Sequence, residues 1–353
     1  VESPSHDVEA LTTSASTLAR VIEARLGVAP RLVDSPAGPH VHWSGGGTPR
    51  VLVVGHHDTV FPLGTLAARP FTVIDGRATG PGVFDMKGGI VQAIHAVAAL
   101  ADRAGIELLF TADEEVGSEA SRGLIEARAA ACGAVLVVEP SADGGALKTA
   151  RKGTGGFEVV VHGRAAHAGL EPEKGINSLV AAAELIGRIA TFGDASLGTT
   201  VTPTMVRGGT AENVVPAETR IVVDVRVVEP DERARVEQLM AGLAGSPLGT
   251  VEGARVEVSG GIGRPPMHPS ASERLFPLAV EAAARAGLGR VDGVAVGGGS
   301  DGNFTAAIGV PTLDGLGAVG GGAHADHEYV LVETMVPRAT LLAGLLDRIG
   351  RPG

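Results

Sequence analysis

The sequence is poor in cysteine and positive charge, and it has no long apolar run. Cys132 is the only cysteine among 353 residues, so no intrachain disulfide can form and no oxidising compartment is needed. The formal charge of −11 argues against nucleic acid or an anionic membrane as a partner, because both attract basic surfaces. No segment reaches about 18 uninterrupted apolar residues, and the first residues lack the features of a signal peptide. We therefore expect a cytoplasmic protein with a small-molecule substrate; a targeting segment ahead of Val1 stays an open alternative.

Aromatic residues are also scarce. They make up 3% of the chain against 44% for all hydrophobic residues, so the core must consist mainly of Val, Leu, Ile and Ala. Such a composition suits layered packing of helices on a sheet. A chain of this length exceeds the size at which a single core usually stops growing, which favours two domains.

Helical and strand patterns alternate in the first part of the chain. Residues 7–26 and 87–104 have apolar positions at helical spacing, whereas 50–58, 106–115 and 133–141 are apolar runs typical of strands buried on both faces. Strands that alternate with helices predict an α/β fold with a mostly parallel sheet. Ligand sites in such folds lie beyond the carboxyl ends of the strands.

The pattern changes near residue 153. From there the order of strands and helices is βαββαβ, which is typical of a split βαβ unit with an antiparallel sheet. After the proline-rich segment 263–270, helices and strands alternate again to the end of the chain. We therefore predict a catalytic domain formed by residues 1–152 and 265–353, with residues 153–264 inserted into it.

Acidic and imidazole side chains gather where the predicted strands end. Each has a simpler interpretation taken alone, such as a core histidine, a helix N-cap or a solvated turn, but all of them fall at one edge of the sheet, which favours a site. Mixed imidazole and carboxylate ligands without thiolates suit Zn²⁺, with Co²⁺ or Mn²⁺ as substitutes. A carboxylate such as Asp85 can bridge two ions about 3.5 Å apart. The candidates are His56, Asp85, Glu114, Glu115, Glu139 and His324.

Five motifs in this order resemble a family of di-zinc exopeptidases and deacylases. The motifs are GHHDTV, GPGVFDMKGG, TADEEVGS, VVEPS and GAHADHEYV. The family includes bacterial glutamate carboxypeptidase, acetylornithine deacetylase, succinyl-diaminopimelate desuccinylase and aminoacylase, and the chain looks most similar to the first. The resemblance covers nearly the whole chain, and it implies that the inserted domain is a dimerisation or lid domain.

The resemblance implies a role for each residue of the motifs. His56 and Glu139 complete one zinc site, Glu115 and His324 complete the other, and Asp85 bridges them. Asp58 orients His56, whereas His57 occupies a variable position. Glu114 acts as the general base, and its side chain points away from that of Glu115 because neighbours on an extended backbone diverge. The peptide bond between Asp85 and Met86 is expected to be cis.

Residues of the inserted domain and of a glycine-rich loop match positions that contact substrate in the family. His167 resembles a histidine that reaches across a dimer and stabilises the tetrahedral oxyanion. Asn213 and Arg226 match residues that hold the substrate carboxylate, as do Gly299 and Ser300 of the loop 295–304, with Asp301 nearby. An ordinary strand arginine is the alternative for Arg226, and a phosphate-binding loop is a weaker alternative for 295–304.

These observations predict a two-zinc metallocarboxypeptidase that releases a C-terminal amino acid, with glutamate as one candidate, from a peptide or an N-acyl conjugate. The nearer alternative is an N-acyl-amino-acid deacylase with the same chemistry. An inactive metal-binding homologue and a nucleotide-binding protein that uses residues 297–302 are more remote. A homodimer formed through the inserted domain is expected.

Overall fold

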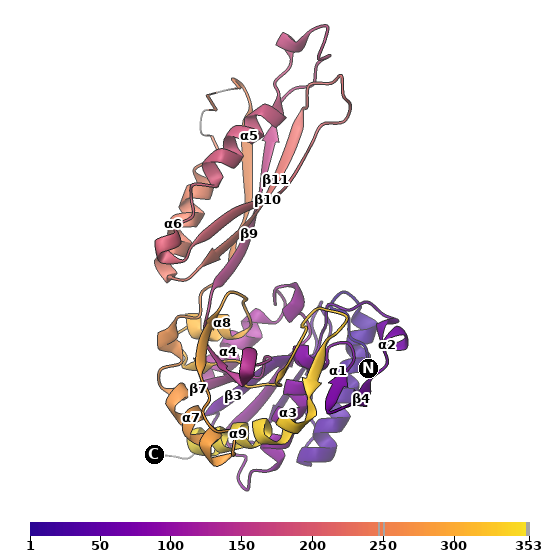
Figure 1. Ribbon diagram of the computed structural model, residues 1–353, viewed down its shortest axis with the longest axis vertical. Coiled ribbons are helices and arrows are strands. Elements are labelled where there is room, and N and C mark those ends of the chain that lie inside the picture. The colour runs from indigo at the N-terminus through magenta and orange to yellow at the C-terminus, as the bar shows by residue number, and fades with distance from the viewer. Residues whose placement is uncertain (246–247, 250, 351–353) are drawn as a thin grey trace. The chain divides into compact units, whose positions relative to one another are not determined.

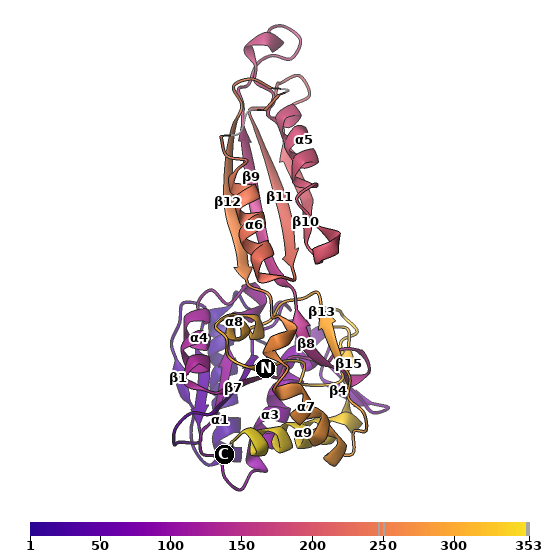
Figure 2. The ribbon, with the colours of Figure 1, turned by 90° about the vertical axis from the view of Figure 1, so that its left-hand side faces the viewer.

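The computed structural model describes residues 1–245, 248–249 and 251–350, and the chain divides into two compact units (Figures 1 and 2). Unit 1 comprises Val1–Arg151, Met267–Val296 and Ser300–Gly353. Unit 2 comprises Lys152–Pro266 and Gly297–Gly299. Unit 2 is thus an insertion into the chain of unit 1.

Unit 1 is built around a six-stranded mixed sheet in the order β1-β2-β6-β3-β7-β14. Strands β6, β3, β7 and β14 run parallel, whereas β1 and β2 extend the sheet on one side in antiparallel fashion. The predicted α/β class is confirmed, but the edge strands β1 and β2 were not predicted. The strands are β1 (Arg31–Val33), β2 (His40–Ser44), β3 (Val51–His56), β6 (Ile106–Thr111), β7 (Ala134–Val137) and β14 (Thr312–Leu313).

Helices cover both faces of this sheet (Figure 1). In β3, Val51 and Val53 pack into the core shared with α1, α3, α7 and α9, whereas Leu52 and Val54 pack under α4 on the opposite face. Burial on both faces explains why the strand sequences are almost continuously apolar. Among the described residues, no helix has both the length and the apolar character needed to cross a membrane. The helices are α1 (Val8–Leu26), α2 (Thr65–Ala68), α3 (Gly88–Ala98), α4 (Arg122–Ala131), α7 (Leu275–Arg285), α8 (Gly302–Ala307) and α9 (Val332–Gly350).

Several predicted elements are shorter in the structure: β3 and β7 end at His56 and Val137 rather than at residues 58 and 141. Helix α3 ends at Ala98 rather than near residue 104, and Arg103 beyond it donates hydrogen bonds to the carbonyls of Ala98 and Leu26 at 2.9 and 3.0 Å. Gly105 then turns the chain into β6 with a φ of 77°. Strand β6 ends at Thr111 rather than at residue 115.

Two smaller sheets complete unit 1. One has the order β15-β16-β5-β4 and carries the loops on either side of the site described below. The other pairs β8 with β13 in parallel. Their strands are β4 (Thr72–Ile74), β5 (Arg77–Thr79), β8 (Leu147–Arg151), β13 (Gly293–Val296), β15 (Gly320–Gly321) and β16 (Tyr329–Leu331).

Unit 2 has the predicted βαββαβ order. Its antiparallel sheet has the order β10-β11-β9-β12, and α5 and α6 pack on the same face of it (Figure 2). Asn177 caps α5 by accepting the N–H groups of Leu179 and Val180. The elements are β9 (Gly153–His162), α5 (Ser178–Ile189), β10 (Thr200–Gly208), β11 (Glu218–Val227), α6 (Pro230–Ala241) and β12 (Arg255–Arg264).

Candidate metal centre

Five side chains with metal-binding chemistry converge at the carboxyl edge of the large sheet. His56 is the last residue of β3, and Glu139 follows β7 by two residues. Glu115 lies in the turn after β6, Asp85 in an irregular turn ahead of α3, and His324 in the loop between β15 and β16. Parallel strands end at a common edge, so residues far apart in the sequence meet here.

Asp85 lies at the middle of this group. Its Oδ1 is 3.3 Å from Nε2 of His56, and its Oδ2 is 3.4 Å from Nε2 of His324. The two oxygens of one carboxylate thus face two different histidines. The peptide bond between Asp85 and Met86 is cis, as the resemblance implied.

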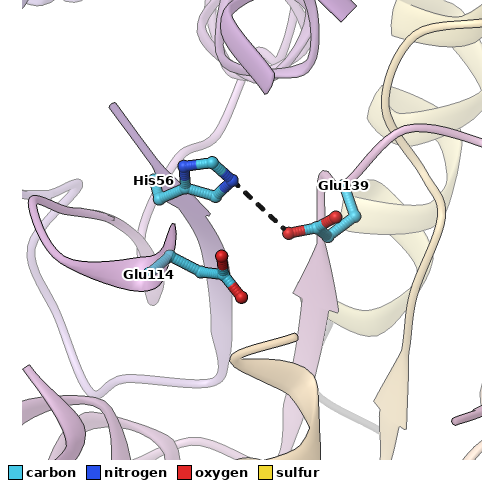
Figure 3. A group of neighbouring side chains, drawn as sticks. All are labelled: His56, Glu114 and Glu139. Atoms are coloured by element: carbon cyan, nitrogen blue, oxygen red, sulfur yellow. Dashed lines mark ion pairs between the residues drawn. The ribbon is translucent and has the colours of Figure 1, made fainter. Parts of the chain in front are cut away.

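Each histidine has a second carboxylate beside it. Glu139 Oε1 is 3.6 Å from Nε2 of His56, the ion pair drawn in Figure 3, and Glu115 Oε2 is 3.0 Å from Nε2 of His324. The Glu114 carboxylate belongs to the first of these groups, since its oxygen lies within 4.8 Å of the donor atoms of His56 and Glu139. Figure 3 shows Glu114 pointing toward the space between those two side chains.

The adjacent glutamates diverge for a reason other than the predicted one. Glu114 and Glu115 do not lie on extended backbone but in a single 3₁₀ turn, Glu114–Val116. Successive side chains in a 3₁₀ turn are about 120° apart. Glu114 therefore lies near His56 and Glu139, whereas Glu115 contacts His324 and lies within 4.8 Å of the donor atoms of Asp85 and His56.

Asp58 is fully buried and holds several members of the site. Its carboxylate and its carbonyl lie 3.3 and 3.0 Å from Nδ1 of His56, which leaves Nε2 facing the cluster. The same carboxylate accepts the N–H groups of Glu114 and Glu115, each at 3.2 Å. By contrast, His57 turns away, with its ring nitrogens 3.2 Å from the Ser14 hydroxyl and 3.0 Å from a backbone carbonyl.

The electrostatics of the cluster favour positive charge at its centre. The hydrogen bonds that His324 donates to Asp85 and then to Glu115 raise its pKa to about 10. Burial works against a carboxylate at Asp85, yet the hydrogen bonds from His324 and His56 hold its pKa well below the usual range. Burial and the negative charge of Asp85 raise the pKa of Glu139 to about 7. The raised pKa values of His324 and Glu139 show that positive charge is favoured between these side chains. A metal cation would be stabilised at the same position.

Arg151 is a buried residue that the sequence did not single out. It lies beside the carboxylate oxygen of Glu139 that does not face His56. Its Nη2 is 3.5 Å from Glu139 Oε2, and its Nε and Nη2 donate to Asp314 at 2.6 and 3.1 Å. Lys148 on the same strand also contributes positive charge near Glu139. Basic residues on a buried strand of an acidic chain are the signal that could have identified this support.

The glycine-rich loop is tied into the protein core. The Ser300 hydroxyl is fully buried and donates to Asp314 at 2.6 Å. Asp301 is also buried and accepts hydrogen bonds from Thr111 and Ser118. Gly299 belongs to unit 2, where a Cβ would lie 3.1 Å from Arg264. The predicted contact of this loop with substrate stays a prediction.

The other predicted substrate residues lie in unit 2. His167 is exposed, and its Nδ1 accepts the N–H groups of Gly169 and Leu170, each at 3.1 Å. Asn213 adjoins it, because its carbonyl accepts the N–H of Ala168. Arg226 donates two hydrogen bonds to Asp224, two residues earlier on β11. None of these contacts tests the predicted roles.

The donor set fits divalent metal ions. It contains imidazole nitrogens and carboxylate oxygens and no thiolate, which is a combination typical of hydrolytic zinc sites. Glu115 Oε1 is buried and has no hydrogen-bond partner. A buried carboxylate oxygen without a partner is unfavourable unless another group, such as a metal ion, satisfies it.

Residues 52–348 match the peptidase family M20/M25/M40. The chain belongs to this family. Its M20 relatives include carboxypeptidase G2 of Pseudomonas sp. (strain RS-16), which is 32% identical over 316 residues, covering 87% of this chain and 75% of the relative. Acetylornithine deacetylase of Myxococcus xanthus is 31% identical over 210 residues, covering 56% of this chain and 54% of the relative. The M20 chain is thus a metallopeptidase-type hydrolase, as predicted.

Solved structures share the M20 fold. The metallo-carboxypeptidase Sso-CP2 of Sulfolobus solfataricus superimposes with a TM-score of 0.77 at 16% identity, covering 99% of this chain and 96% of that structure. The YXEP protein of Bacillus subtilis, described as a dinuclear metal-binding M20 peptidase, gives a TM-score of 0.66 at 18% identity, covering 99% and 95%. At these identities the likeness establishes the fold.

Proposed function

We propose that this M20 chain uses two divalent metal ions to release a C-terminal amino acid from a peptide or an N-acyl conjugate. Zn²⁺ is the first candidate for these ions. The observation that carries the proposal is the position of Asp85, whose two carboxylate oxygens face His56 and His324 separately. A carboxylate in that position is suited to bridge two ions. The similarity to carboxypeptidase G2 favours the carboxypeptidase reaction.

The ligands divide into two sets that share Asp85. His56 and Glu139 belong to one set, with 3.6 Å between their facing atoms, and Glu115 and His324 belong to the other, with 3.0 Å between theirs. The histidines would hold such ions as neutral imidazoles and the acidic residues as carboxylates, so binding would release protons. Co²⁺ and Mn²⁺ suit the same ligands.

Glu114 is the proposed general base. Bound ions would polarise the substrate carbonyl and lower the pKa of a water molecule. The Glu114 carboxylate, which lies beside His56 and Glu139, accepts a proton from the attacking water at one oxygen and delivers it to the leaving amine. Asp58 holds the backbone of Glu114 in place during both transfers.

His167 is proposed to stabilise the oxyanion of the neighbouring subunit's substrate. Because its Nδ1 accepts two backbone hydrogen bonds, the neutral ring carries its proton on Nε2. That proton can be donated to a developing negative charge. This role requires a homodimer, which we propose to form through unit 2. Asn213, Arg226, Gly299 and Ser300 remain the proposed contacts of the substrate carboxylate.

A deacylase that acts on N-acyl amino acids is the second candidate. The similarity to acetylornithine deacetylase supports it, and the same metal ligands and base serve both reactions. A panel of dipeptides and N-acyl amino acids, each series with one half fixed, separates the two. Cleavage confined to one C-terminal residue supports the carboxypeptidase, whereas cleavage confined to one acyl group supports the deacylase.

Substitution of Glu114 by alanine tests the mechanism. We expect Glu114→Ala to bind two zinc ions per chain and to hydrolyse an N-acyl-glutamate at least about 100-fold more slowly, because the base is lost and the ligands are kept. Glu119→Ala, which removes an exposed glutamate nearby, is the matched control and should behave as the unsubstituted protein. If zinc content falls together with activity in Glu114→Ala, the roles of Glu114 and Glu115 are exchanged.

A further inference from the structure

Glu328 forms an unusual set of contacts with the turn that carries Asp85. Its side chain is 1% exposed. Oε2 accepts the N–H of Gly82 at 2.8 Å, and Oε1 accepts the N–H groups of Phe84 and Asp85 at 2.9 and 2.8 Å. Three backbone donors thus converge on one buried carboxylate.

Three N–H groups of this turn have Glu328 as their acceptor. Residues 83–87 do not form a regular helix, since Asp85 and Met86 have non-helical φ and ψ angles. Gly82 precedes them with a φ of 73°. The N–H groups of Gly82, Phe84 and Asp85 are therefore not used in helical hydrogen bonds and take their acceptor from another segment. Hydrogen bonds to a carboxylate are roughly twice as strong as those between neutral groups, so Glu328 can hold the turn firmly.

The segment that carries Glu328 also carries His324. A tight turn joins the two residues, in which the N–H of Ala325 donates to the carbonyl of Gly322 and the N–H of Glu328 donates to the carbonyl of Ala325. His324 faces Oδ2 of Asp85, while Glu328 holds the N–H of the same aspartate. One short segment therefore contacts both the side chain and the backbone of Asp85.

We propose that Glu328 is a positioning residue for metal binding, which sets the place of Asp85 relative to His324. The inference rests on the proposed function. Its effect falls mainly on the site that Glu115 and His324 share with Asp85, because that site depends on the alignment of two loops. His56 ends a central strand and Glu139 follows its neighbour, so the other site keeps its own support from the sheet.

Glu328→Gln tests the inference with little change in side-chain volume. The NH₂ group of the glutamine amide is a donor and cannot accept a hydrogen bond from the backbone N–H groups of the turn. At least one of these N–H groups then lacks an acceptor, which loosens the turn. Zinc binding is measured by competition with a chelator, starting from metal-free protein. We expect the ion at Glu115 and His324 to bind about 10- to 100-fold more weakly and the other ion to lose clearly less affinity. Glu333→Gln, at an exposed glutamate of α9, is the matched control and should leave both affinities unchanged.

Glu328→Asp is the second variant, to be used if Glu328→Gln does not fold. It keeps the negative charge but has a shorter side chain. We expect it to weaken the same zinc ion. A lower melting temperature of the metal-free variant with both zinc affinities unchanged would overturn the inference, since Glu328 would then be a structural residue only. Equal weakening of both ions would overturn its assignment to one site. If the unsubstituted protein binds no zinc, the proposed function itself fails.

Discussion

Replacing Asp58 by asparagine tests how the candidate centre is held together. One carboxylate oxygen of Asp58 lies 3.3 Å from Nδ1 of His56 and accepts the N–H of Glu114. The other accepts the N–H of Glu115 and the hydroxyl of Ser5, the latter at 2.7 Å. An asparagine amide has only one oxygen, so either orientation directs its NH₂ group at a backbone N–H. At least one buried donor then loses its acceptor.

The size of the effect follows from that loss. A buried donor left without a partner costs about 1–3 kcal/mol, so the free energy of unfolding of the metal-free protein should fall by about that amount. Zinc affinity should fall about 10- to 100-fold, because a neutral amide replaces the carboxylate beside Nδ1 of His56 and the backbone carbonyl of residue 58 alone keeps its contact. Urea unfolding measures the first quantity and chelator competition the second.

The matched control is Asp143→Asn, at an exposed aspartate in the loop before β8. It should change the free energy of unfolding by less than about 0.5 kcal/mol and leave zinc affinity unaltered. If Asp58→Asn has the same free energy of unfolding and the same zinc affinity as this control, the contacts of Asp58 do not support the site. The proposal that Asp58 holds the site together is then refuted.

Two further predictions concern assembly and burial. Mixing the Glu114→Ala and His167→Ala proteins under conditions of subunit exchange should restore activity. One site of each mixed dimer then has an intact Glu114 and the partner's intact His167. Demonstrated exchange without recovery of activity would contradict sharing of His167 between subunits. Burial raises the pKa of the Cys132 thiol to about 12. Iodoacetamide at pH 8 should therefore label Cys132 in urea but not in the native protein. Rapid labelling of the native protein would refute the burial of this thiol.

The sheet and its functional edge could be predicted because their signals are local. The runs around Val53, Leu109 and Leu136 are apolar at consecutive positions, which indicates strands covered on both faces. The polar residues that follow each run were then placed at one edge by the general rule for parallel sheets. The short strands β1 and β2 have no such signal, with three and five residues, and were missed.

Apart from the contact of Asp58 with His56, which the family resemblance implied, the supporting contacts of the site could not be predicted, because they join segments distant in the sequence. The ion pair between Arg151 and Asp314 spans 163 residues, and Glu328 contacts Asp85 across 243 residues. Nothing in the local pattern of either segment specifies such a partner. Likewise, the 3₁₀ turn at Glu114 is set by the hydrogen bonds of Asp58, 56 residues earlier. Tertiary structure alone brings these groups together.

Titration of the metal-free protein with Zn²⁺ tests the central claim, that two ions share Asp85 in one hydrolytic site. Bound zinc per chain and the rate of hydrolysis of an N-acyl-glutamate are measured at each point of the titration. The account predicts two zinc ions bound per chain and a rate that reaches its maximum only when both sites are filled. Full activity with a single bound ion, or hydrolysis that persists without any metal, would contradict it.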